Sequence, residues 1–391
     1  MLKTAAAFIP RCVIFGFVLV VSLLGCGGGG GGGYTIDLTS YSGIAAGDLN
    51  GDGRTDLVMT ANSSVKVLLQ DPIDNGVFQG ATSYPLADGL EFVDIGQINN
   101  DNLPDLVISN RNSNTVSVLA QDPAQPGIFQ LYGDYGTGDH PDRIASGDLN
   151  GDGLADIAAG GSYLTLLYND PVDPGSFYTG GTLAVVPNFS SVAIADLDGD
   201  GRNDFATTGD GVVTLLFQDA APLAPGSFSV AGTYTAGPNP VDVAVADLDA
   251  DGKADLAVAS YSTSVAQGDA SVSVLLQEHD PALRGTFQAA VNYPAGSDSS
   301  DVAVGDLNND GRPDLAVVNN INVSVLLQSA TPGVYLPATN LKADIPSRVA
   351  IADLNEDGLN DLAIADFERA WIYFQDPAIP GTFRPRVLLR P

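Results

Sequence analysis

Residues 48–56 read Asp-Leu-Asn-Gly-Asp-Gly-Arg-Thr-Asp, and this nine-residue phrase returns along the whole chain. Each intact copy has Asp at position one, Asp or Asn at position three, Asp at position five, Gly at position six and Asp at position nine. The intact copies begin at Asp48, Asp148, Asp196, Asp247, Asp306 and Asp353, and an altered copy begins at Gln97. A phrase repeated about every 50 residues indicates an array of similar supersecondary units, which must stack to bury a core.

Oxygen-bearing side chains at alternate positions, followed by Gly, suit a hard cation such as Ca²⁺. Side chains at positions one, three and five converge on one point, the Gly permits a sharp turn, and later oxygens complete the shell. Without a cation, the carboxylates of one loop would repel one another. An EF-hand is excluded because position twelve of the first loop is Met59 and the flanking residues resemble strands. We therefore expect about six Ca²⁺ ions with a structural role.

The expected ligands are the side chains at positions one, three, five and nine and the backbone carbonyl at position seven. In chain order they are Asp48, Asn50, Asp52, Arg54 and Asp56; Asp148, Asn150, Asp152, Leu154 and Asp156; Asp196, Asp198, Asp200, Arg202 and Asp204; Asp247, Asp249, Asp251, Lys253 and Asp255; Asp306, Asn308, Asp310, Arg312 and Asp314; Asp353, Asn355, Asp357, Leu359 and Asp361. The altered copy keeps Asn99, Asp101 and Asp105 but has Gln97 at position one and Asn102 at position six. Because Asn tolerates left-handed backbone, we expect this unit to fold with an empty or weak metal site.

Each repeat also contains the strands of one structural unit. Around the sixth loop, residues 301–307, 314–318, 322–328 and 334–336 form four short runs in which apolar and small residues alternate. Four short strands and three turns are the content of one propeller blade. An aromatic residue follows the last turn of each repeat, and we expect these residues to pack between blades: Phe78, Phe129, Phe177, Phe228, Phe287, Tyr335 and Phe383. The sequence predicts an all-β fold, a seven-bladed β-propeller of four-stranded antiparallel blades, with each metal loop joining strands one and two.

On these in-register copies, the chain resembles the FG-GAP/VCBS repeat family, whose best-known relative is the integrin alpha-chain β-propeller. The resemblance covers residues 34–391. It implies a seven-bladed propeller with Ca²⁺ in the hairpins between strands one and two, but it implies no single function, because propellers host unrelated activities. The closure of the ring stays open: residues 34–38 resemble a fourth strand for the last blade, whereas residues 383–389 resemble that blade's own fourth strand.

The N-terminal segment has the features of an export signal. Lys3 and Arg11 form a positive region, and residues 13–24 are an apolar run too short to span a bilayer. The following Leu-Leu-Gly-Cys resembles a bacterial lipobox, so we interpret residues 1–25 as a lipoprotein signal peptide and Cys26 as the lipidated residue. An ordinary secretory signal cleaved nearby is the alternative.

Residues 26–33 contain the lipidated Cys and a poly-Gly run, which we expect to act as a flexible tether. Gly27 follows the Cys in place of the Asp associated with inner-membrane retention, which favours the outer membrane. Contact with a membrane is expected only through the lipid. Whether the propeller faces the periplasm or the cell surface is not decided by the sequence.

Composition limits the function classes. The chain has 16 basic and 47 acidic side chains and a formal net charge of −31, which argues against binding nucleic acid. Catalysis finds little support, because His140 and His279 are the only histidines and neither a Gly-x-Ser-x-Gly motif nor a phosphate loop occurs. A carboxylate pair of the glycosidase type stays open. We expect a non-enzyme.

A partner is expected on the face opposite the metal loops, where the two–three and four–one loops should lie. Function usually resides in loops on a rigid scaffold, and the related face carries ligand contacts in integrins. The candidate residues are Tyr135, Asp139, His140, Tyr261, Asp269 and Tyr293. We expect a calcium-stabilised interaction or adhesion module at a bacterial envelope that binds a protein or glycan. A lectin-like propeller and, less favoured, an envelope hydrolase are the alternatives.

Overall fold

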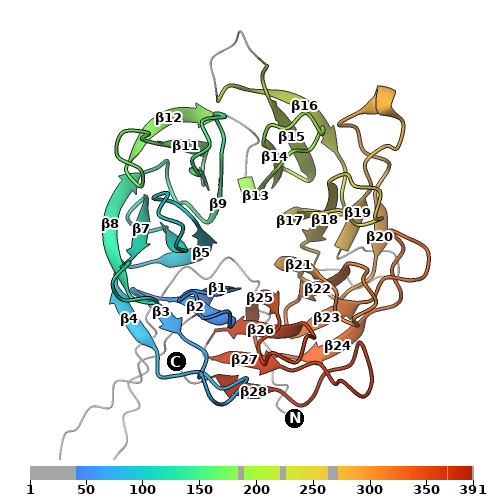
Figure 1. The fold of residues 1–391 in the computed structure, drawn as a ribbon. Coiled ribbons are helices and arrows are strands. Elements are labelled where there is room, and N and C mark those ends of the chain that lie inside the picture. Colours follow the sequence, from blue (N-terminus) through green and yellow to red (C-terminus); the bar gives the residue numbers. More distant parts are fainter. Residues whose placement is uncertain (1–40, 184–188, 221–225, 263–271, 368, 390–391) are drawn as a thin grey trace, which may run out of the picture.

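The computed structural model describes residues 41–183, 189–220, 226–262, 272–367 and 369–389, which form a ring of seven four-stranded antiparallel sheets (Figure 1). This arrangement confirms the predicted seven-bladed β-propeller. In every blade the strands pair in sequence order. The residues of the propeller's N-terminal end, the signal segment and the tether lie outside the described residues. None of the described helices is long and apolar enough to cross a membrane.

The strands of blades one to four follow in chain order. Blade one comprises β1 (Tyr41–Gly47), β2 (Asp56–Ala61), β3 (Ser64–Leu68) and β4 (Thr82–Pro85). Blade two comprises β5 (Leu90–Gly96), β6 (Asp105–Asn110), β7 (Thr115–Gln121) and β8 (Phe129–Gly136). Blade three comprises β9 (Arg143–Gly147), β10 (Asp156–Gly160), β11 (Leu164–Asn169) and β12 (Phe177–Leu183). Blade four comprises β13 (Phe189–Ala195), β14 (Asp204–Gly209), β15 (Val212–Gln218) and β16 (Phe228–Tyr234).

The remaining blades follow the same plan. Blade five comprises β17 (Pro240–Ala246), β18 (Asp255–Ser260), β19 (Val272–Leu275), the 3-10 turn η1 (Pro281–Leu283) and β20 (Val291–Tyr293). Blade six comprises β21 (Asp301–Gly305), β22 (Asp314–Val318), β23 (Asn322–Leu326) and β24 (Thr339–Lys342). Blade seven comprises β25 (Pro346–Ala352), β26 (Asp361–Asp366), β27 (Ala370–Tyr373) and β28 (Val387–Leu389).

The position of a strand within its blade decides its burial. The first strands surround the central axis and the fourth strands form the rim (Figure 1). The second strands are buried along their whole length, as in β2 and β18, because neighbouring blades cover both of their faces. The core is therefore a series of layers between blades, such as the cluster that joins Leu315 and Val317 of blade six to Ala257 and Val274 of blade five.

The aromatic residues after the last turn pack between blades, as predicted. Four of them contact a Tyr from the fourth strand of the preceding blade edge-to-face, with ring centroids 5.1–5.9 Å apart: Phe129 with Tyr84, Phe177 with Tyr135, Phe287 with Tyr234 and Tyr335 with Tyr293. Such pairs contribute about 0.5–1.5 kcal/mol beyond the area that they bury. They hold adjacent blades together at the rim.

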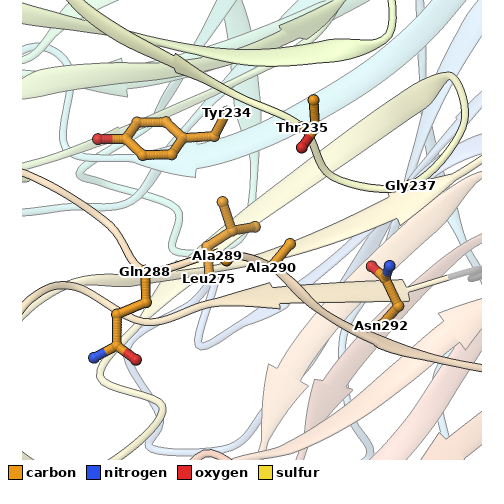
Figure 2. Close-up of a pocket in the computed structure, with 8 residues that line it drawn as sticks. All are labelled: Tyr234, Thr235, Gly237, Leu275, Gln288, Ala289, Ala290 and Asn292. Carbon is orange, nitrogen blue, oxygen red and sulfur yellow. The ribbon is translucent and has the colours of Figure 1, made fainter.

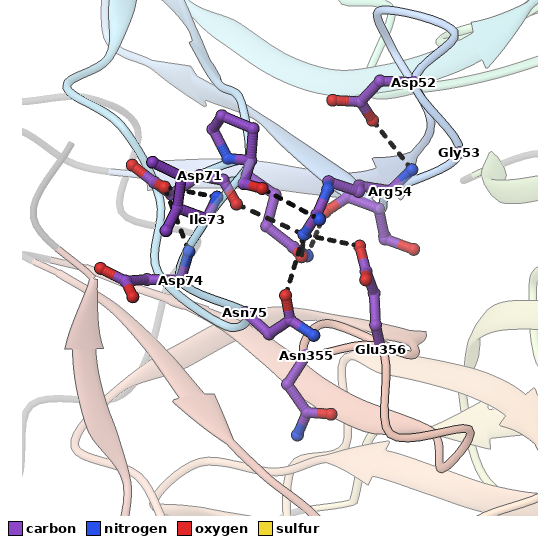
Figure 3. Close-up of polar contacts among 12 residues, drawn as sticks. Asp52, Gly53, Arg54, Asp71, Ile73, Asp74, Asn75, Asn355 and Glu356 are labelled. Atoms are coloured by element: carbon purple, nitrogen blue, oxygen red, sulfur yellow. Dashed lines mark hydrogen bonds and ion pairs between the residues drawn. The ribbon is translucent and has the colours of Figure 1, made fainter.

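The ring closes by packing between blades seven and one. β28 pairs with β27, so the C-terminal segment supplies the last blade's fourth strand. Ser347 Oγ donates a hydrogen bond of 2.9 Å to the Tyr41 carbonyl. On the loop face, Arg54 Nη1 lies 2.8 Å from Glu356 Oε1 and donates to Asn75 Oδ1 at 2.9 Å, as Figure 3 shows.

The two faces of the disc carry the loops that the sequence assigns to them. Arg54 Nη2 donates to the Pro72 carbonyl at 3.1 Å, which places a three–four turn beside a one–two loop. On the other face, Gly89 N donates to the Asn62 carbonyl at 3.0 Å, which joins a four–one loop to a two–three loop.

Candidate metal loops

Each metal loop joins the end of a first strand to the start of a second. Gly47 pairs with Asp56 across the first hairpin, and Ala246 pairs with Asp255 across the fifth, so position nine is the first residue of the second strand. The eight residues between these pairs form a closed turn. The prediction that the loops lie between strands one and two is confirmed.

The side chains at positions one, three and five point inward and accept backbone hydrogen bonds. In the first loop, Asp48 Oδ1 accepts from Gly51 N at 2.7 Å and Asp48 Oδ2 accepts from Gly53 N at 2.8 Å. Asn50 Oδ1 accepts from Asp52 N at 2.8 Å, and Asp52 Oδ1 accepts from Arg54 N at 2.9 Å. These bonds fold the backbone around the side-chain oxygens and order the loop.

Two backbone positions of every loop have left-handed conformation. Position six has φ of 78–87° in the six loops where it is Gly and φ of 69° at Asn102. Position four, whose residue type varies among the loops, has positive φ as well: Gly51, Asn100, Gly151, Gly199, Ala250, Asn309 and Glu356. The altered loop therefore folds through Asn102, as predicted.

Asp at position nine is fully or almost fully buried and connects the loop to the third strand. Asp56 Oδ2 accepts from Leu49 N at 2.9 Å, and Asp56 Oδ1 accepts from Gln70 N at 2.7 Å. Burial raises the pKa of Asp56 to about 6 and that of Asp204 to about 7, and the other acids of the loop add to the effect. Each metal loop thus holds a carboxyl group whose ionisation is opposed by its surroundings.

Loops four and five, which have Asp at position three, bring three carboxylates together. Oxygens of Asp196, Asp198 and Asp204 lie within 4.8 Å of one another. Oxygens of Asp247, Asp249 and Asp255 do the same. Oxygen ligands of one Ca²⁺ ion lie 2.3–2.6 Å from the metal, so separations of up to about 5 Å between them fit a shared ion. This donor set fits a hard dication.

A buried amide then ties five of the loops to the next blade. The third strand is followed or ended by Gln, or by Asn169 in blade three, and in five blades this side chain donates to the carbonyl at position two of the preceding blade's loop. The bonds run from Gln70 to Leu354 at 3.0 Å, from Asn169 to Ile98 at 2.7 Å, from Gln277 to Leu197 at 2.6 Å and from Gln328 to Leu248 at 2.8 Å. Gln218 bonds to the Leu149 carbonyl in the same way as these four. In blades two and seven, Gln121 and Gln375 donate instead to a carbonyl of their own blade's loop. Gln328 ends the expected third run of blade six, but its interblade bond could not be read from the sequence.

A family model described as an FG-GAP-like repeat matches residues 48–108, 97–159, 148–207, 196–258 and 263–317, which together cover more than half of the chain. The chain belongs to the FG-GAP repeat family. Four of the five matched segments begin at position one of a metal loop, and one of these four begins at the altered copy, Gln97.

Solved structures resemble this FG-GAP propeller at low sequence identity. One is an Agrocybe aegerita lectin described by its specific recognition of non-reducing terminal N-acetylglucosamine, with a TM-score of 0.55, 18% identity and coverage of 88% of this chain and 93% of that chain. Another is a Lactobacillus plantarum protein, with a TM-score of 0.54, 14% identity and coverage of 79% and 86%. No curated protein matches the chain. Identities this low show a shared fold alone.

The predicted partner surface of the FG-GAP propeller is only partly assembled. Asp139 and His140 are exposed together in a four–one loop, and Tyr261 is half-buried after β18. Tyr135 and Tyr293 need correction: they lie on rim strands, where each ring packs against the next blade and each hydroxyl donates to a backbone carbonyl, at 3.0 and 3.3 Å. They are interblade packing residues. Asp269 lies outside the described residues.

Charged residues gather in the central channel of the propeller. The residue five places before each loop belongs to the first strand and is Gly43, Phe92, Arg143, Ser191, Asp242, Asp301 or Arg348. Six of these seven line a cavity of about 190 Å³. Arg143 lies 3.2 Å from Asp242 and 3.4 Å from Asp301, and its guanidinium stacks 5.1 Å from the Phe92 ring centroid. The sequence shows that these residues lie at a constant offset from the loops, but only closure of the ring brings them together in one cavity.

The two channel carboxylates differ in their ionisation. Burial and the negative charge of Asp242 raise the pKa of Asp301 to about 6. Burial also opposes ionisation of Asp242, but Arg143 and Arg348 outweigh it and lower the pKa of that carboxyl. Asp301 is therefore the weaker acid of the pair.

A pocket of about 340 Å³ lies between blades four and five (Figure 2). Tyr234 and Thr235 come from the end of blade four, and Gln288 and Asn292 come from the segment around β20. Asn292 Oδ1 accepts a hydrogen bond of 2.7 Å from Ser273 Oγ, which fixes the amide orientation. The pocket offers an aromatic ring and amide groups to a small polar ligand.

Proposed function

We propose that this chain is a calcium-stabilised β-propeller that serves as a binding module at a bacterial envelope, anchored through lipid on Cys26. The observation that carries the calcium assignment is the convergence of three carboxylates in each of loops four and five. The raised pKa values of the position-nine acids support it, because a dication stabilises the ionised form that burial disfavours. The ions would act structurally, by joining strands one and two of each blade.

Calcium removal tests this assignment on the purified full-length protein. Chelation with excess EGTA should lower the thermal midpoint by about 10 °C or more, with about six ions released, because binding to the folded state alone stabilises it. Asp196→Ala should release one ion, whereas Asp139→Ala on the opposite face should release none. An unchanged midpoint, or a count near one, would contradict structural calcium.

The role as an interaction module rests on the exposed loops opposite the metal loops. Asp139 and His140 are exposed there on a rigid scaffold, which is where propellers and other folds commonly carry binding residues. Saturable binding of an envelope protein without turnover, reduced in a double Asp139→Ala, His140→Ala variant, is the expected result. Release of a product from an envelope polymer would instead favour the hydrolase.

Loss of membrane association in Cys26→Ser would support the anchor.

Carbohydrate binding is the second candidate, and the pocket in Figure 2 favours it. Its aromatic ring and amides are groups that suit sugar hydroxyls, and the similar lectin fold binds N-acetylglucosamine. Isothermal titration calorimetry with N-acetylglucosamine should then show binding. Gln288→Ala should weaken this binding, whereas Gln130→Ala, on another blade, should leave it unchanged. Absence of binding at millimolar sugar would remove this candidate.

A further inference from the structure

The turn between β19 and β20 differs from its counterparts in other blades. In four blades Asp-Pro follows the buried amide residue at once, as in Gln70-Asp71-Pro72. In blade five two residues, Glu278 and His279, come between Gln277 and the Asp-Pro pair. This insertion brings one of the chain's two histidines to the metal-loop face.

The inserted turn is held in place by backbone and side-chain hydrogen bonds. Glu278 N donates to the Thr286 carbonyl at 2.8 Å, and Lys253 Nζ donates to the Glu278 carbonyl at 2.6 Å. Asp280 caps η1 by accepting from Ala282 N at 2.9 Å. These bonds fix His279 above its own blade's metal loop, while the imidazole stays 60% exposed and open to ions from solvent.

The imidazole faces two carboxylates of loop five. His279 Nδ1 lies 2.7 Å from Asp251 Oδ2, and Nε2 lies 3.5 Å from Asp249 Oδ2. One ligand atom from each of these three residues lies within 4.8 Å of the other two. Asp251 Oδ1 accepts from Lys253 N at 2.9 Å, so its other oxygen is the one directed to the histidine.

Asp249 belongs to two ligand groups at once. It lies with His279 and Asp251 on the outer side and with Asp247 and Asp255 on the inner side. A carboxylate has two oxygens and about four acceptor positions. It can therefore serve one cation inside the loop and another beside it, and the same holds for Asp251, which is also an expected ligand of the loop's own Ca²⁺.

The two groups differ in the metal that they suit. Oxygen-only ligands favour hard ions such as Ca²⁺, whereas an imidazole nitrogen favours Zn²⁺ and other late first-row dications. We infer that His279, Asp251 and Asp249 form a second cation site beside loop five, which binds a transition-metal dication such as Zn²⁺. Water would complete its coordination. The site is independent of whether the other loops hold Ca²⁺.

Zn²⁺ titration of the full-length protein in millimolar Ca²⁺ tests the site. His279→Ala should weaken the tightest Zn²⁺ binding by at least about tenfold. His140→Ala, which removes the other histidine on the opposite face, should leave it unchanged. Thermal midpoints in Ca²⁺ should match among the three proteins, since both imidazoles are exposed, and this comparison separates ligand loss from misfolding.

The two histidine ring resonances supply a second readout. Substoichiometric Co²⁺ should shift or broaden the signal that His279→Ala removes and spare the other. Equal Zn²⁺ affinity in His279→Ala and the parent would overturn the inference. Equal broadening of both histidine signals would overturn it as well, because it would indicate adventitious binding. Release of one Ca²⁺ per Zn²⁺ bound would refute the two adjoining sites.

Discussion

Positions four and six of each metal loop show what a single residue contributes to this fold. Both positions have left-handed backbone, which costs an L-residue about 1–2 kcal/mol and costs Gly almost nothing. The sequence revealed position six through its recurrent Gly. Position four varies among Gly, Asn, Ala and Glu, so composition gave no signal, and Ala250 and Glu356 adopt φ of 63° and 58°. Loop closure overrides the local preference at these two residues.

Replacing Gly358 by Ala should lower the free energy of unfolding by about 1–2 kcal/mol. Gly358 has φ of 80° and no atom within 4 Å of an added Cβ, so the cost is that of the backbone alone. Gly136→Ala is the control, because its Cβ would also meet open space while its φ is ordinary. Urea denaturation in Ca²⁺ measures both variants. Equal stabilities of the two would show that position six is not strained.

Asp301 in the channel makes stability depend on pH. Its folded-state pKa, about 6, exceeds the ordinary value of about 4, so folding favours the protonated form. Its contribution is therefore fully present below about pH 4 and is lost as the pH rises through about 6. Relative to Asp301→Asn, the parent should lose on the order of 2 kcal/mol between pH 4 and pH 8. Urea titrations at both pH values, with Asp139→Asn as the exposed control, test this; a constant difference would contradict it.

At the scale of the element, the metal loop, the second strand and the third strand act together. The position-nine Asp is the first residue of the second strand. Its carboxylate accepts a hydrogen bond from a backbone N–H at the end of the third strand or just after it, as Asp314 does from Gln328 N at 2.6 Å. The Gln side chain then reaches the preceding blade. The sequence placed the metal loops and the first three strands of blade six correctly because their patterns are local. The expectation that the fourth strand begins at residue 334 was wrong: Tyr335 makes only an isolated bridge with Gln328, and β24 begins at Thr339. The sequence could not show the amide bond, because its acceptor lies about 80 residues away in the chain.

Gln328→Ala should lower the free energy of unfolding by about 1–3 kcal/mol, because the Leu248 carbonyl loses its side-chain donor while the Pro313 carbonyl keeps the hydroxyl of Tyr335. The side chain is buried and donates to the Leu248 carbonyl at 2.8 Å and to the Pro313 carbonyl at 3.0 Å. Gln130→Ala, an exposed amide on β8, is the matched control and should change stability by less than about 0.5 kcal/mol. Urea denaturation compares them. Similar costs would mean that the interblade bond adds nothing.

At the scale of the molecule, blades one and seven meet at a junction without a covalent link among the described residues. Blade seven completes itself with β28, and Leu354 and Ile372 pack in one cluster with Leu57 and Met59 of blade one. The repeat predicted the number of blades, yet both closures were compatible with the sequence because either segment could supply an edge strand. The partner surface was harder to predict from the sequence. Tyr135 and Tyr293 resemble exposed loop residues there, but they pack against the next blade at the rim.

Opening of the ring should begin at this junction. Gln70→Ala and Gln328→Ala remove the same type of bond, 3.0 Å long to Leu354 and 2.8 Å long to Leu248, but only blades five and six are also joined by the chain. We expect native-state proteolysis in Ca²⁺ to be several-fold faster for Gln70→Ala at matched global stability, because local opening sets the rate of cleavage. The first cuts should fall in blades one and seven, located by mass spectrometry of the fragments. The Arg54–Glu356 ion pair is partly exposed and adds little to the junction, so Glu356→Gln is the control and should be cleaved at the parent rate. Equal rates for the two Gln variants would show that the junction is as strong as any other interblade contact.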